Sequence, residues 1–154
     1  MISFNLVSAS IKKFIKEQIS YKDSIYNETN DGQTLKFEFH HFTYFFKVYL
    51  GPKARIIMTY NNKGLGLKVI FDEEKSKKID FDALSKVVKE NTNQGYFEVN
   101  MTKCSPYNPN LIIDFAIPHE CFDLDTLDDA VYIIGIVIQK LFLFHIITSS
   151  HVGN

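Results

Sequence analysis

The sequence has little arginine and no excess of charge of either sign. Only Arg55 of its 17 cationic residues is an arginine, and 18 acidic residues balance them. Guanidinium groups supply the paired donors that recognise phosphates and bases, and a polyanion partner needs a positive protein surface. The composition therefore argues against a nucleic acid or an anionic membrane as the partner.

The sequence also has few cysteines and no targeting segment. Cys104 and Cys121 do not have the spacing of a redox pair or of a disulfide framework. No basic stretch followed by an apolar run and a small-residue cleavage site opens the sequence, so we expect no secretory signal. Both observations favour a cytoplasmic protein with reduced thiols.

What is present is typical of one globular domain over residues 1–154. Apolar residues make up 45% of the chain and charged residues 23%. A chain of this length buries roughly 70% of the surface that it exposes when unfolded, so its core needs no metal or cross-link. We expect no cofactor.

Apolar periodicity predicts the first elements. Residues 4–19 carry a helical stripe with Ser3 as its N-cap, whereas residues 21–33 are rich in Asn, Asp, Ser and Gly and predict a connection. Strand-like alternation follows over residues 35–50, but its phase changes at His40-His41. Because a strand's side chains alternate between faces, we expect a bulge there.

Short turns at Gly51-Pro52 and at residues 61–64 predict an antiparallel meander through strands at 55–60 and 65–71. Residues 72–78 predict a solvated charged loop, and Asp80 predicts the cap of a middle helix. Two further strands, at 96–101 and 111–117, precede a long helix capped by Asp123 or Asp125. The expected fold is α+β: an antiparallel sheet of about five or six strands with N-terminal, middle and C-terminal helices packed on it.

The terminal helix is unusually apolar. Between residues 130 and 148 only Gln139, Lys140 and His145 are strongly polar. Monomers seldom expose so large an apolar patch, so the pattern predicts association, with coverage by the sheet and the N-terminal helix as the alternative. A membrane tail is not favoured, since a central lysine costs roughly 2.5–3.5 kcal/mol on insertion. The residues expected to associate are Ile133, Ile136, Val137, Leu143 and Phe144.

No motif in the sequence indicates a particular reaction. His119, Cys121 and the upstream Cys104 match no structural zinc spacing, and Gly64-Leu65-Gly66 lacks the third glycine of a phosphate-binding turn. We therefore expect neither a catalytic residue nor a metal site. A small metal-dependent or thiol-dependent enzyme remains an alternative.

The second half of the chain resembles the YbjN-like and type III secretion chaperone-like family. The resemblance lies in a helix at residues 81–90, strands at 96–99 and 111–118, and an acidic-started helix at 124–147 that follows Pro118. The terminal helix is more apolar than is usual for that family. The resemblance implies a small, commonly dimeric, non-catalytic protein that holds another polypeptide in extended form.

Together these observations predict a protein-binding module, chaperone-like or adaptor-like and homodimeric. Exposed sheet edges would bind a client polypeptide, with Tyr44, Phe46 and Tyr49 in contact with it. An alternative is an immunity-type inhibitor of one toxin or enzyme, for which acidic residues hint at a binding face: Asp123, Asp125, Asp128 and Asp129.

Overall fold

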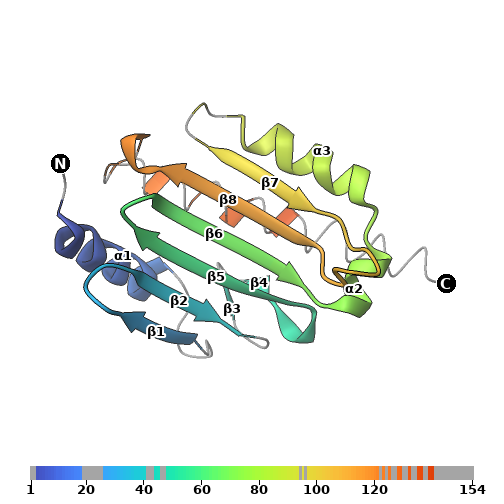
Figure 1. Cartoon of the computed structure of the whole chain (residues 1–154), viewed down its shortest axis with the longest axis horizontal. Helices are drawn as coiled ribbons and strands as arrows, with labels where there is room; N and C mark the ends of the chain where they lie inside the picture. Colours follow the sequence, from blue (N-terminus) through green and yellow to red (C-terminus); the bar gives the residue numbers. More distant parts are fainter. Residues whose placement is uncertain are drawn as a thin grey trace.

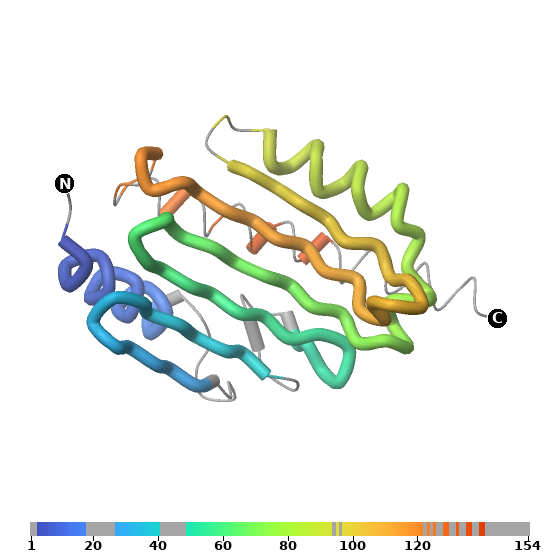
Figure 2. Tube along the Cα trace, in the orientation of Figure 1, coloured from blue at the N-terminus to red at the C-terminus, as the bar shows by residue number. Residues whose placement is uncertain are grey.

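The structure is a computed structural model of the 154-residue chain. It describes residues 3–18, 26–40, 44–45, 48–93, 95, 97–121, 123, 125, 128–129, 132, 135–136 and 139–140. Figure 2 traces this path from the N-terminal helix to the last described residues.

The fold is α+β, as the sequence predicts, and its centre is an open antiparallel sheet of six strands (Figure 1). The strand order is β1-β2-β5-β6-β8-β7, so β8 lies between β6 and β7. The strands are β1 (Tyr26–Asn30), β2 (Leu35–Phe39), β5 (Ala54–Asn61), β6 (Gly64–Phe71), β8 (Ile112–Pro118) and β7 (Glu98–Thr102).

Helices precede the first strand, separate β6 from β7 and follow β8 along the chain. They are α1 (Phe4–Gln18), α2 (Glu73–Lys78) and α3 (Phe81–Asn91), with short turns η1 (Gly51–Lys53) and η2 (His119–Cys121). Helical residues also recur between positions 125 and 140, and these pieces lie behind the sheet in Figure 1.

One face of the sheet carries the core. Apolar side chains at alternate positions of β2, β5, β6 and β8 are buried together with the inner sides of α1 and α3. Phe37, Met58 and Phe115 occupy one row of this face, because directly paired residues of neighbouring strands point to the same side.

We call the opposite side of the sheet the open face. Apart from Ile70, which is buried, its residues are more exposed than those of the core face and include both charges and small side chains, the pattern of an antiparallel sheet with one solvated side. Its residues, from β2 to β7, are Lys36, Glu38, Arg55, Ile57, Thr59, Gly66, Lys68, Ile70, Ile112, Asp114, Ala116, Glu98, Asn100 and Thr102.

Several local predictions are confirmed. The turn over residues 61–64 joins β5 to β6, where Gly64 has a φ of 123°. Asp80 caps α3, since its carboxylate accepts hydrogen bonds from the backbone N–H groups of Asp82 and Ala83 at 3.1 and 3.2 Å. Ser3 caps α1 by accepting the N–H of Leu6 at 3.2 Å.

The predicted connection over residues 21–33 is wrong, because Tyr26–Asn30 is a strand. β1 pairs with β2 along its whole length. Its described side chains are exposed and polar, so no apolar alternation marks it, and backbone pairing with β2 places it in the sheet.

The predicted strand over residues 42–50, joined by a bulge at His40-His41, is also wrong. β2 ends at Phe39, and the chain forms a separate hairpin from β3 (Tyr44–Phe45) and β4 (Val48–Tyr49). The change of phase thus accompanies departure from the sheet; His41 lies outside the described residues.

The predicted solvated loop over residues 72–78 is a helix. Asp72 caps α2 by accepting the N–H of Lys75 at 2.6 Å. Two ion pairs lie on the surface of α2, Lys77–Glu73 and Lys78–Glu74, and each joins residues one helical turn apart. Lys75 and Ser76 are buried against the rest of the molecule.

Candidate functional site

The outer edge of β1 is the less covered of the two outer edges of the six-stranded sheet in the described part of the chain. β1 pairs with β2 on one side, and no described strand pairs with the other. At the opposite end of the sheet, α3 runs alongside β7 (Figure 1). β1 contains no proline or lysine, residues that commonly protect edges, so its free backbone groups can accept another strand.

The side chains of β1 are anchored to its neighbours. Glu28, on the core side, forms an ion pair with Lys12 of α1 at 3.2 Å. Asn27, on the other side, lies 3.0 Å from the imidazole Nε2 of His40. These contacts hold the strand in place while leaving its outer backbone edge unpaired among the described residues.

An aspartate within the turn that joins β1 to β2 stabilises that turn. The Asp31 carboxylate accepts hydrogen bonds from the N–H groups of Gln33 and Thr34 at 2.9 and 2.7 Å, and these bonds lower the pKa of Asp31. Gly32 takes a φ of 87°, which suits a residue without a Cβ. The hairpin therefore fixes the position of the β1 edge.

The aromatic residues predicted to contact a client lie away from this edge. Tyr44 and Tyr49 pair with each other across the β3-β4 hairpin, outside the six-stranded sheet. Tyr49 is 46% exposed, whereas Phe46 lies outside the described residues. The structure thus brings two of the three predicted residues together, on a different element from the one expected.

The described part of the terminal helix shows a polar outer edge. Tyr132 and Lys140 are exposed, whereas Gly135 is buried and Ile136 half-buried. Lys140 donates a hydrogen bond to the Asn91 side chain at the end of α3, at 2.8 Å. Of the residues predicted to associate, four lie outside the described residues: Ile133, Val137, Leu143 and Phe144.

Two further predictions concern this region. Within the described residues, no helix has the length and apolar character needed to cross a membrane; most of the apolar run at 130–148 lies outside them. The acidic residues at the start of the helix, Asp123, Asp125, Asp128 and Asp129, are all exposed.

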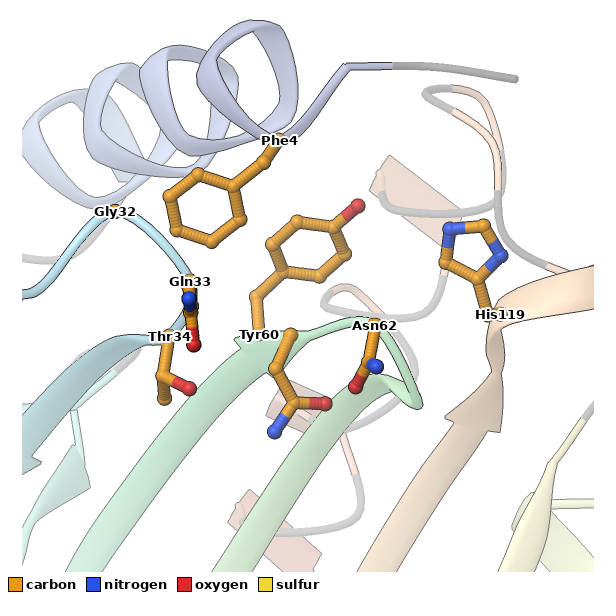
Figure 3. A pocket seen from close by; sticks show the side chains of 8 residues that line it. Phe4, Gly32, Gln33, Thr34, Tyr60, Asn62 and His119 are labelled. Carbon is orange, nitrogen blue, oxygen red and sulfur yellow. The ribbon is translucent and has the colours of Figure 1, made fainter.

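A hollow of about 350 Å³ opens at the end of the sheet where α1 begins (Figure 3). Phe4 stacks on Tyr60 at 5.8 Å between ring centroids, and burial raises the pKa of Tyr60. The remaining lining is Gly32, Gln33, Thr34, Asn61, Asn62 and His119. Gln33, Asn61 and Asn62 offer amide hydrogen-bonding groups, and the Asn61 amide also accepts the backbone N–H of Lys63 within the turn between β5 and β6.

The structure separates the residues of the enzyme alternative. Cys104 follows the end of β7 that pairs with the start of β8, whereas His119 and Cys121 follow the end of β8. Seven residues of β8 therefore lie between them, roughly 20 Å of strand. Among the described residues, no three His, Cys, Asp or Glu side chains are grouped so that they could hold a metal ion.

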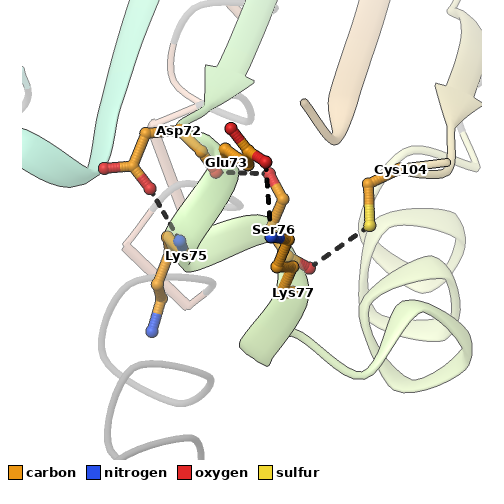
Figure 4. Close-up of polar contacts among 6 residues, drawn as sticks. All are labelled: Asp72, Glu73, Lys75, Ser76, Lys77 and Cys104. Carbon is orange, nitrogen blue, oxygen red and sulfur yellow. Dashed lines mark hydrogen bonds and ion pairs between the residues drawn. The ribbon is translucent and has the colours of Figure 1, made fainter. Parts of the chain in front are cut away.

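The corner where α2 meets the sheet contains a buried polar network (Figure 4). The Ser76 hydroxyl donates to the Asp72 carbonyl at 2.6 Å and accepts the N–H of Leu111 at 2.8 Å. The Cys104 thiol lies 3.8 Å from the Ser76 carbonyl. Lys75 is 8% exposed, and burial together with the ammonium groups of Lys53 and Lys78 lowers its pKa.

Comparison of the chain with protein-family models, with curated proteins and with solved structures found no match. The chaperone-like resemblance therefore rests on the residues and element order of the sequence.

Sequence reasoning missed the β1 edge and α2, although each left a signal. Asp31-Gly32 is a common hairpin dipeptide, and it directly follows β1. Glu73 and Glu74 precede Lys77 and Lys78 by four residues, the spacing of helical ion pairs.

Proposed function

We propose that this chain is a non-catalytic protein-binding module, chaperone-like or adaptor-like, which holds an extended segment of a client polypeptide along β1. The observation that supports this proposal is the outer edge of β1, with which no described strand pairs, in a sheet whose other outer strand is flanked by α3. An added strand obtains its affinity from backbone hydrogen bonds, which require an edge of this kind.

The surroundings of β1 indicate the character of the client. A strand added to this edge meets Asn27 and Thr29 on the open-face side and the Lys12–Glu28 pair on the other side. These groups are polar or mutually neutralised. We therefore expect an extended, proline-free client with polar residues next to β1, rather than an apolar one.

The proposal is tested with an array of extended synthetic peptides and the full chain labelled for amide NMR. We expect bound peptides to shift the amide signals of residues 26–30 most strongly. Replacing Asn27 and Thr29 together with lysine should weaken binding at least about tenfold, because edge lysines oppose strand addition.

The matched control is the double replacement Asn100→Lys and Thr102→Lys on β7, the other outer strand. These residues are also polar and exposed, and their replacement adds the same charge. Peptides that bind without shifting residues 26–30, or equally well to both double variants, contradict the proposal, as does the absence of any binding peptide.

A second candidate function is the inhibition of one basic toxin or enzyme. Asp125, Asp128 and Asp129 are exposed, and their spacing places them on one side of a helix. Such a partner should bind faster at low ionic strength. Replacing all three with asparagine should slow association at least tenfold if this surface binds, and an unchanged association rate contradicts it.

A further inference from the structure

The centre of the open face has a pattern that is complementary to itself. β6 and β8 pair there in three successive rows: Gly66 beside Ala116, Lys68 beside Asp114, and Ile70 beside Ile112. Lys68 and Asp114 have opposite charges, lie 4.0 Å apart and keep 46% and 43% of their side-chain surface exposed. Both groups can therefore still bind a charge presented from above the sheet.

A two-fold axis that runs parallel to the strands, above the line between β6 and β8, makes use of this pattern. Rotation about this axis places β6 of one copy over β8 of the other. Each row keeps its position along the strands, so it faces the same row of the second copy. Lys68 then faces Asp114 of the second copy, and Asp114 faces its Lys68, so four charges alternate in sign. Gly66 faces Ala116. In the third row Ile112 is half-buried and Ile70 is only 7% exposed, so this row adds little to the contact.

The next strands outward bring no like charges together under the same rotation, although Ile57 then lies opposite the polar Asn100. β5 of one copy lies over β7 of the other, which places Thr59 opposite Glu98 and Arg55 opposite Thr102. No pair of like charges is superposed in these rows. Aligned sheets normally pack within about 30° of parallel, and such a rotation displaces the rows of β6 and β8 less than those of the outer strands.

We propose that the open face binds the open face of a second copy of this chain, so that the two sheets stack about this two-fold axis. Charge complementarity between Lys68 and Asp114 argues for the second copy as the occupant, because one surface supplies both halves of the contact.

Gly66 allows the two sheets to approach closely. Glycine weakens a strand, and here the chain's own packing does not require it: the nearest atom to an added Cβ would be a backbone oxygen 3.9 Å away. A side chain at this position would point out of the open face. Gly66 and Ala116 together leave room there for the facing sheet.

The size of the overlap sets the expected strength of the dimer. Four strands per copy overlap, about 20 Å wide and about 20 Å long, which gives roughly 400 Å² of sheet per copy. This area lies below that of standard stable interfaces, so we expect a weak dimer that forms only at high protein concentration. β1 and β2 lie outside the overlap, which leaves the β1 edge free in both copies.

The experiment measures the mass of the full chain by sedimentation equilibrium from about 1 µM to about 1 mM. Wild type should pass from monomer to dimer. Lys68→Glu or Asp114→Lys should each raise the dimer dissociation constant at least about tenfold, and the double exchange K68E/D114K should return it to within about threefold of wild type.

Two further variants separate assembly from folding. Gly66→Phe should remain folded by circular dichroism yet stay monomeric. Lys77→Glu changes the same charge on α2, where Lys77 is 67% exposed, and should dimerise like wild type.

The proposal is overturned by a wild-type monomer at every concentration, by a double exchange that stays monomeric, or by a dimer that ignores all open-face variants. Loss of the dimer in Val137→Asp but not in Gly66→Phe would also overturn it, since the terminal helix would then form the contact. Peptide binding to β1 is measured separately, so either proposal can fail without the other.

Discussion

Replacing Ser76 with alanine tests the polar network that joins α2 to β8. The Ser76 hydroxyl is the acceptor for the N–H of Leu111, a residue that is 1% exposed, and the two residues lie 35 positions apart. Alanine leaves this buried N–H without its acceptor, which costs about 1–3 kcal/mol. The Asp72 carbonyl keeps a partner, because it also accepts the backbone N–H of Ser76 at 2.8 Å. The expected loss of unfolding free energy is therefore about 2 kcal/mol.

The loss is measured by urea unfolding followed by circular dichroism. We expect the slope of the unfolding free energy against urea concentration to be unchanged. For a chain of this length it corresponds to a fall in Tm of about 4–8 °C. Ser85→Ala on α3 is the control and should change stability by less than about 0.5 kcal/mol. A loss below about 0.5 kcal/mol in Ser76→Ala would refute the reasoning, because the Leu111 N–H would then have another partner.

Two more predictions concern Lys75, which lies beyond the end of β6, and Gly64, at its start. Lys75→Met should raise stability by about 1 kcal/mol at neutral pH, since it removes a partly desolvated ammonium and keeps the apolar stem. Because the folded pKa of Lys75 lies below its ordinary 10.5, wild type should lose stability as pH falls from above 10.5 through that folded pKa, and the variant should lose less; equal pH profiles contradict this. Gly64→Ala should lower stability by at least about 2 kcal/mol in thermal unfolding, because φ is 123° and a Cβ would collide with the Ile117 carbonyl; a Tm within about 2 °C of wild type contradicts it.

The sequence predicts elements whose pattern is local and apolar. The alternation in β5 and β6, the glycine turn between them and the Asp80 cap each occupy a few adjacent residues, and all are confirmed. β1 and α2 were missed because their own residues bury little apolar surface. Pairing with β2 stabilises the first, and contacts such as that between Ser76 and Leu111 stabilise the second.

The candidate surfaces depend on contacts that a single sequence does not show. The edge position of β1 follows from the strand order, and the row that joins Lys68 to Asp114 follows from the pairing of strands about 45 residues apart. The aromatic run at residues 42–50 wrongly predicts a strand of the main sheet, because alternation does not tell which sheet a strand joins.

The position of β8 between β6 and β7 also affects how the chain is synthesised. Strands β1, β2, β5 and β6 form a meander that is complete at Phe71, but β6 then presents an apolar strand edge until β8 has been made. Roughly 50 residues separate the two events, about 2–10 s at ordinary rates of translation. During that interval the nascent chain is itself a client, and general chaperones that bind exposed strands should associate with it until Pro118 has left the ribosome.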